Sequence, residues 1–389
     1  MPRPSAPLTY LPAELASAGA AQAQLLDLYT GQNPYGPPPH VLEAARAAVC
    51  ERSPDALASA ARSSIAQRFG VTPGRVLPGA GASELAWSAA RALVRPGGVW
   101  LSIEPAQSPC VAAARSVGAR ITRWRSVERT GHSVDLEQVA ELMRLEQPGV
   151  VSLCAPGSPT GASVPVEAVF ELAARFADVQ FVVDQSWLPL SDDHADLERV
   201  PPDNVLCLRS LTLSCALPGL RAGYALGSSP LLAAIADARP PFAVSAPALA
   251  ALAAAVQEDE HITRCRHQLQ ADRSQLRALL DTLGLAHTPS VVPFALVRVA
   301  RAAEVTASCI GPPSRRNLYV VVTCVWQSMS PGRIVTSPRS KTSAPRVIVR
   351  PGPTAVILSP SMRTTGFSTI RPATTTAANR TLATMSRPM

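Results

Sequence analysis

The stretch NVLCLRSLTLSCALPGLRAGYALG (residues 204–227) is the most informative part of this sequence about its fold. An apolar run lies at each end of it, and the turn between them carries Ser210, Thr212 and Arg221. Short apolar runs of this kind are typical of buried parallel strands. Two hydroxyls and a guanidinium beside the end of a strand suit a phosphate group. The stretch therefore predicts two strands joined by a turn that can bind an anion.

The sequence on both sides continues this alternation of apolar runs and amphipathic stretches. Alternating strands and helices predict an α/β sheet with helices on both faces, and ligands then bind at the carboxyl ends of the strands. We expect buried strands over 98–103, 149–156, 179–186, 204–211 and 221–227, and helices over 81–94, 135–146, 165–177 and nearly all of 245–284.

Polar or glycine-rich loops follow several of these expected strands. The segment GASE (81–84) opens a helix, where backbone N–H groups can bind a phosphate, although an ordinary N-cap at Ser83 has the same pattern. The segment PTG (159–161) predicts a tight turn. Asp184 ends an apolar strand, where it faces a ligand or caps a helix. Each of these signals, taken alone, also has a purely structural explanation. The functional interpretation therefore rests on their occurrence together.

In this order and spacing, the segments resemble the large domain of fold-type I pyridoxal-phosphate-dependent aminotransferases of class I/II. The resemblance runs from about Asp27 to Val299, begins with DLYTGQNPYGPPP (27–39), and is similar to the branch of histidinol-phosphate aminotransferase and threonine-phosphate decarboxylase. It implies a three-layer α/β/α large domain of the aspartate-aminotransferase-like type, with an incomplete or missing C-terminal small domain. It also implies a homodimer that acts on an amino-acid or amino-phosphate substrate in amino-acid or cobalamin biosynthesis. We expect a cytoplasmic location because the sequence shows neither a membrane span nor the pattern of a signal peptide.

The resemblance also assigns residues to the cofactor, pyridoxal 5'-phosphate. Asp184 pairs with the pyridine nitrogen and keeps the ring protonated, so that the ring acts as an electron sink. Asn33 is the residue that the resemblance places at the substrate. The remaining cofactor contacts that it implies are Ala82, Ser83, Ser210, Thr212 and Arg221 for the phosphate, Ser158 and Trp187 near the phenolic oxygen, and Cys110 over the ring.

Leu213 occupies the position of the family's Schiff-base lysine, eight residues before Arg221. Leucine has no amine, so it can neither bond the cofactor nor move the substrate's proton. The only lysine of the chain is Lys341. We therefore expect a catalytically impaired protein that binds the cofactor noncovalently, if it binds it. The alternative is a pseudoenzyme or scaffold that binds the cofactor noncovalently or binds a partner subunit, and whether the chain is an enzyme stays open.

Other positions depart from the family in the same direction. Where the family has an aromatic ring over the cofactor, an Asn before Pro-Thr-Gly, a Tyr near the phenolic oxygen and a Tyr that reaches the partner's phosphate, this chain has Cys110, Ser158, Trp187 and Ser53. An arginine for the substrate's carboxylate is not evident in the C-terminal part. Several departures at cofactor contacts indicate relaxed constraint on the site.

The charge distribution divides the chain near residue 304. The segment 305–389 holds 11 of the 36 Lys and Arg residues and none of the 28 Asp and Glu residues. We expect an N-terminal arm (1–40), a large domain (41–244), a helical segment leading into a remnant small domain (245–304), and a basic Ser/Thr/Pro/Arg-rich tail (305–389) that is not a folded domain. The tail's composition also resembles GC-rich coding sequence read out of frame, and this alternative stays open.

Several classes of protein are excluded by the same sequence. No apolar run reaches the roughly 18 residues of a membrane span, and the N-terminus lacks the pattern of a signal peptide. The eight cysteines form no C-x-x-C pair, and SDDHADLE (191–198) favours a solvated segment over a metal cluster. The tail lacks an aromatic platform, so we expect no nucleic-acid partner.

Overall fold

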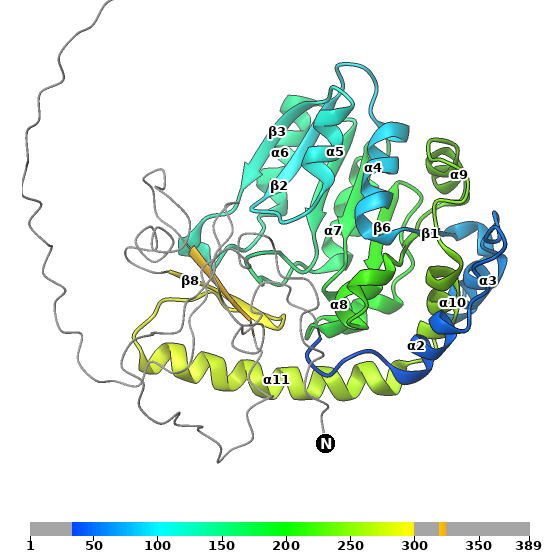
Figure 1. Ribbon diagram of the computed structural model, residues 1–389. Coiled ribbons are helices and arrows are strands. Elements are labelled where there is room, and N and C mark those ends of the chain that lie inside the picture. Colours follow the sequence, from blue (N-terminus) through cyan, green and yellow to red (C-terminus); the bar gives the residue numbers. More distant parts are fainter. Residues whose placement is uncertain (1–32, 299–318, 324–389) are drawn as a thin grey trace, which may run out of the picture. The chain divides into compact units, whose positions relative to one another are not determined.

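One mixed sheet organises the residues that the structure describes (Figure 1). The computed structural model describes residues 33–298 and 319–323, all within one unit, Met1–Ile357. The strand order is β1-β7-β6-β5-β4-β2-β3. The strands are β1 (Val76–Gly79), β2 (Val99–Glu104), β3 (Arg120–Arg125), β4 (Val150–Cys154), β5 (Gln180–Asp184), β6 (Val205–Ser210) and β7 (Gly223–Leu226).

Five of these strands were expected, but the direction expected for one of them, β7, was wrong. The strands β3, β2, β4, β5 and β6 are parallel, whereas β7 is antiparallel to both β6 and β1. The expectation of a parallel strand over 221–227 is therefore overturned. The connection between β6 and β7 begins and ends at the same edge of the sheet, whereas a parallel neighbour would need a crossover that returns along the sheet to its opposite edge.

Two strands, β1 and β3, were not expected. β1 contains Pro78, which a strand tolerates at a sheet edge, and β1 is one edge of this sheet. β3 is the opposite edge and reads RITRWR, with exposed arginines at both ends. Edge strands often carry charges and Pro, so a search for apolar runs overlooks them.

Helices cover both faces of the sheet and complete three layers. On one face, the buried side chains of the sheet pack with α2 (Pro39–Arg46), α3 (Ser59–Arg68), α6 (Leu136–Glu146), α7 (Val166–Arg175) and α10 (Ala246–Ala255). On the other face they pack with α4 (Gly81–Leu93), α5 (Cys110–Ser116) and α9 (Ser229–Asp237). The expected α/β/α large domain is confirmed.

Local signals explain where several helices begin. The carboxylate of Asp135 accepts hydrogen bonds from the backbone N–H groups of Glu137 and Gln138, both at 3.1 Å, and so caps α6. Ser245 caps α10 in the same way. The expected helical stretch 245–284 is two helices, α10 and α11 (Asp259–Thr282), with a break at 256–258. None of the helices in the described part of the chain is long and apolar enough to cross a membrane.

Shorter elements connect these layers. They are η2 (Pro73–Arg75), η3 (Glu128–Thr130), η4 (Leu188–Leu190), η5 (His194–Glu198), α8 (Leu211–Ser214) and η6 (Pro218–Leu220). After α11, β8 (Phe294–Arg298) pairs antiparallel with β9 (Tyr319–Thr323). β9 falls in the stretch expected to be an unfolded tail, so it is an unpredicted strand. The rest of that prediction, and the arm before Asn33, lie outside the described residues.

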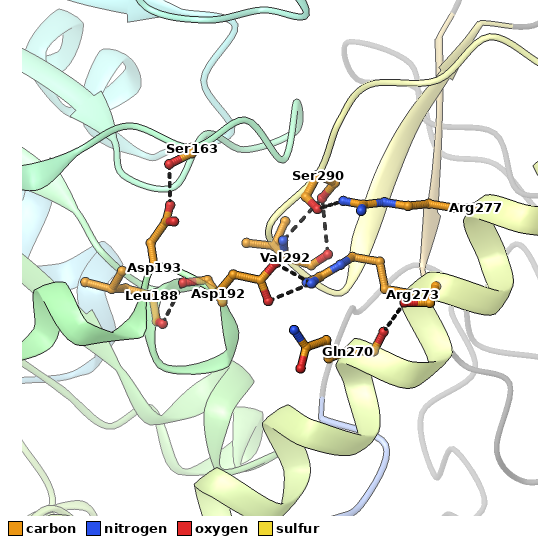
Figure 2. A network of polar contacts seen from close by, with 11 residues as sticks. Ser163, Leu188, Asp192, Asp193, Gln270, Arg273, Arg277, Ser290 and Val292 are labelled. Carbon is orange, nitrogen blue, oxygen red and sulfur yellow. Dashed lines mark hydrogen bonds and ion pairs between the residues drawn. The ribbon is translucent and has the colours of Figure 1, made fainter.

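A polar network joins α11 and the following loop to the segment after β5 (Figure 2). The guanidinium of Arg273, 4% exposed, donates to both carboxylate oxygens of Asp192. Ser290 lies so close to Gly161 that a side chain at Gly161, where φ is +72°, would overlap it. Asp192 belongs to the segment 191–198 that was expected to be solvated. Asp192 is itself exposed, as a solvated segment requires, and its ion pair with the buried Arg273, 81 residues away in sequence, is a contact that the sequence did not indicate.

We predict that Asp192→Ala destabilises the fold by about 3 kcal/mol, because it leaves the buried guanidinium of Arg273 without its carboxylate. Urea unfolding followed by circular dichroism measures the change. The matched control is Asp281→Ala, since Asp281 is 72% exposed and its ion-pair partner among the described residues is His287. Equal unfolding midpoints for the two variants would contradict the prediction.

Candidate active site

The carboxyl ends of the parallel strands bring the predicted residues to one edge of the sheet. β2 ends at Glu104, β4 at Cys154, β5 at Asp184 and β6 at Ser210. The antiparallel β7 begins two residues after Arg221 and so starts at the same edge. Loops that are distant in sequence therefore converge where α/β sheets bind their ligands.

Asp184 is the buried acid of this edge, with 9% of its surface exposed. Its Oδ1 accepts hydrogen bonds from the backbone N–H (3.0 Å) and the hydroxyl (2.6 Å) of Ser186. Its Oδ2 accepts one from the hydroxyl of Ser108 at 3.1 Å. Burial raises the pKa of Asp184, and these hydrogen bonds oppose the rise by favouring the charged form. Asp184 closes the turn after β5 and caps no helix, because η4 begins only at Leu188.

Arg221, Thr212 and the first backbone N–H groups of α4 form a group of donors that we call the anion cradle. The guanidinium of Arg221 donates from Nη1 to the hydroxyl of Thr212 at 3.3 Å. Its Nη2 lies 2.9 Å from the point where a Cβ on Gly81 would stand, so a side chain at Gly81, where φ is +82°, would collide with it. A guanidinium, a hydroxyl and the first N–H groups of a helix thus face one another, which is the arrangement that binds phosphate.

The helix α4 begins before Ser83, the residue that one interpretation of the sequence took as its N-cap. The helix begins at Gly81, and the side chain of Glu84 reaches back to accept a hydrogen bond from the backbone N–H of Ala80 at 3.0 Å. Ser83 is exposed in the first turn and is not the N-cap. The N-cap interpretation of Ser83 is therefore wrong. Ala82 and Ser83 instead place their backbone N–H groups in the first turn of the helix, next to Arg221.

Leu213 lies in α8, between the cradle and Asn33. Ser210 caps α8 by accepting a hydrogen bond from the backbone N–H of Thr212 at 3.1 Å. The carbonyl of Leu213 accepts a hydrogen bond from the backbone N–H of Asn33 at 3.1 Å, and the side-chain amide of Asn33 donates to the carbonyl of Ser214 at 2.9 Å. The buried side chain of Asn33 thus holds the turn that carries position 213. The prediction that Asn33 contacts a substrate stays a prediction.

Three further predicted residues lie around Asp184. Cys110 begins α5 and is 2% exposed, and burial raises the pKa of its thiol to about 12. Ser158 is buried, and its carbonyl accepts a hydrogen bond from the backbone N–H of Gln107 at 2.6 Å. The ring of Trp187 packs edge-on against Phe294, with centroids 4.9 Å apart. Trp187 is therefore in contact with the first strand after α11.

Ser108 was missed by the sequence analysis, and Gly81 was included only as part of the segment 81–84, without its own contact to Arg221. Ser108 lies in a loop whose sequence matches no motif, and its role follows only from its hydrogen bond to Asp184 in the folded chain. For Gly81, the glycine itself was a signal, because a helix that opens on glycine allows close approach of another group. No group of three or more His, Cys, Asp or Glu side chains that could hold a metal occurs in 33–298 and 319–323.

A family model and individual relatives agree on the family to which this chain belongs. Residues 23–335 match the model of aminotransferase class I and II. Histidinol-phosphate aminotransferase 1 of Thiobacillus denitrificans is 30% identical over 319 residues, which is 79% of this chain and 80% of that protein. Histidinol-phosphate aminotransferase of Paramagnetospirillum magneticum is 33% identical over 282 residues, covering 71% of this chain and 77% of that protein.

Solved structures share the fold. Histidinol-phosphate aminotransferase from Sinorhizobium meliloti, in complex with pyridoxal-5'-phosphate, superposes with a TM-score of 0.68 at 21% identity, covering 76% of this chain and 85% of that chain. A tetra mutant of Thermus thermophilus aspartate aminotransferase superposes with a TM-score of 0.66 at 22% identity, covering 77% of this chain and 91% of that chain. At these identities the likeness shows an aspartate-aminotransferase-like fold.

Proposed function

Because the chain belongs to the class I and II aminotransferase family, whose cofactor is pyridoxal phosphate, we propose that it is a histidinol-phosphate-aminotransferase-like protein that holds this cofactor noncovalently and is catalytically impaired. One observation carries the proposal: Leu213 occupies the turn between Thr212 and Ser214, beside an intact anion cradle. The site retains what binds the cofactor and lacks the amine that would bond it.

The described residues fit a noncovalently bound pyridoxal phosphate. The first N–H groups of α4, with the hydroxyls of Ser210 and Thr212 and the guanidinium of Arg221, would hold the phosphate. Asp184 would pair with the ring nitrogen, and Ser158 would donate to the phenolic oxygen. When bound, the cofactor supplies an electron sink for a carbanion next to the substrate's amino group.

Proton transfer is the function for which α8, the element that carries position 213, offers no base. The side chains of α8 are apolar or hydroxyl groups. The nearest thiol in sequence, Cys215, is buried, and burial raises its pKa to about 12, so it stays protonated and is a poor base at neutral pH. A positioned general base contributes about 10²–10⁴-fold in rate, and this contribution is missing at position 213.

The proposal includes a homodimer in the cytoplasm that recognises an amino-acid or amino-phosphate substrate of the kind that its relatives' names indicate. A cleft of about 710 Å³ between the α2–α3 connection and α10 supports the dimer, because it is lined by Ser53, Pro54 and Asp55, next to alanines of both helices. In the resemblance drawn from the sequence, a Tyr of this segment reaches the partner's cofactor phosphate, and Ser53 replaces that Tyr here, so the support comes from the position of the segment beside the cleft. The exposed Val49 and Leu57 add apolar surface on the same connection.

The experiment that tests the proposal is a titration of the protein with pyridoxal phosphate, followed by borohydride reduction and peptide mapping. We expect saturable binding by equilibrium dialysis and no reduced adduct on any peptide within 200–230. A stable adduct in this range would contradict the proposal that the cofactor is held noncovalently. Absence of saturable binding would favour the alternative, a scaffold that has lost the cofactor.

A further inference from the structure

The loop between β2 and α5 contacts two candidate cofactor residues at once. The backbone N–H of Gln107 donates to the carbonyl of Ser158 at 2.6 Å, which fixes the loop on the turn after β4. One residue later, the hydroxyl of Ser108 donates to Oδ2 of Asp184 at 3.1 Å. The same hydroxyl lies 3.2 Å from the sulfur of Cys110. The first contact holds the backbone of the loop, and this leaves the hydroxyl of Ser108 aimed at the acid.

The direction of these hydrogen bonds follows from the acidity of the groups. A carboxylate only accepts, so the single proton of the Ser108 hydroxyl goes to Asp184. The thiol of Cys110 keeps its proton, since burial raises its pKa to about 12, and it can therefore donate weakly to the oxygen of Ser108. The hydrogen bonds therefore run from the thiol of Cys110 to the hydroxyl of Ser108, and from that hydroxyl to the carboxylate of Asp184.

Ser108 is the partner of one particular oxygen of Asp184. Both hydrogen bonds from Ser186 end on Oδ1, whereas the bond from Ser108 ends on Oδ2. With only Oδ1 held, the carboxylate could turn about its Cβ–Cγ bond. Donors on both oxygens fix the plane of the carboxylate and help to keep its charge in a buried position.

We propose that Ser108 is a positioning residue, which fixes the Asp184 carboxylate in the orientation that pairs with the ring nitrogen of a bound pyridine cofactor. This inference rests on the proposed function, because it assigns Ser108 a role through Asp184 toward the same cofactor. Ser108 acts on the acid and touches neither the phosphate cradle nor position 213 in the contacts of the described residues.

The first measurement needs no cofactor. Carboxyl ¹³C NMR follows the titration of Asp184, which faces the thiols of Cys110 and Cys154 as its titratable neighbours. A hydrogen bond to the charged form lowers a pKa, so its loss in Ser108→Ala raises the midpoint of Asp184, by about half a pH unit or more. Ser108→Thr keeps a hydroxyl and should restore the midpoint. Ser116→Ala, which removes a hydroxyl bonded to a carbonyl within α5, is the matched control. An unchanged midpoint in Ser108→Ala overturns the inference.

The second measurement is a double-mutant cycle on the affinity for pyridoxal phosphate. We expect Ser108→Ala to weaken binding about tenfold in the native background and less than about twofold in Asp184→Asn, because the hydroxyl acts only through the carboxylate. Equal losses in both backgrounds overturn the inference and leave the proposed function standing. If the unmodified chain does not bind the cofactor at all, the proposed function fails, and the positioning role toward a cofactor falls with it.

Discussion

Leu213→Lys is expected to turn a chain that forms no covalent adduct with pyridoxal phosphate into one that forms a stoichiometric, borohydride-reducible adduct at residue 213. The new amine would lie in α8, directly after Thr212 of the anion cradle. Noncovalent binding at the cradle and at Asp184 would bring the aldehyde of the cofactor to it. The partly buried, apolar position of Leu213 lowers the pKa of an introduced amine by desolvation, which leaves more of it neutral and able to attack.

Mass spectrometry of the reduced, digested protein gives a clear readout, because Lys341 is the only lysine in the native chain. The matched control is Leu145→Lys, since Leu145 is 77% exposed on α6 and distant from the cradle in sequence. This control should acquire at most a trace of adduct at a cofactor concentration that saturates Leu213→Lys. A folded Leu213→Lys protein without adduct at 213 would show that the cradle and Asp184 are assigned wrongly.

The restored amine is expected to give little or no transaminase activity towards glutamate or histidinol phosphate. By the resemblance drawn from the sequence, Cys110 replaces the ring that would lie over the cofactor, and Ser158 replaces a longer amide. Misplacement of reacting groups by about 1 Å can cost about 10²-fold in rate. Turnover at a level normal for the family would mean that these departures are harmless.

Arg221→Asn is expected to weaken the binding of pyridoxal phosphate about 10²-fold. The guanidinium of Arg221 lies against Gly81 at the start of α4 and donates to the hydroxyl of Thr212. Two charge-assisted hydrogen bonds to a phosphate, each worth roughly 1.5–3 kcal/mol, correspond to about 10²- to 10⁴-fold, and the lower end applies because Arg221 is exposed to solvent. Asparagine is chosen because Arg221 has a φ of +52°, a left-handed conformation that asparagine tolerates well.

Equilibrium dialysis with pyridoxal phosphate and with unphosphorylated pyridoxal separates the phosphate contact from other effects. The loss in Arg221→Asn should be confined to the phosphorylated ligand. Arg264→Ala is the control, since Arg264 is 66% exposed and pairs only with Glu260 on the same helix. Similar losses for both ligands would indicate that Arg221 shapes the site without contacting the phosphate.

The amino-acid sequence by itself determined the layered α/β architecture. Buried strands and amphipathic helices leave a local pattern, because burial alternates with the period of each element; α7, with Val166, Val169, Leu172 and Ala173 buried, is a clear example. The sequence also fixed the absence of an amine at Leu213, which is a matter of residue identity alone. It failed for β1 and β3, because strands at a sheet edge carry polar residues and proline and leave no apolar run.

The tertiary structure decided which polar groups meet. Ser108 and Asp184 lie 76 residues apart, and they touch only because the strands before them, β2 and β5, each lie next to β4 in one sheet. The antiparallel direction of β7 likewise brings Arg221 back to the start of α4. Such contacts depend on the order and direction of strands, which are set by packing over the whole sheet, and no local periodicity records them.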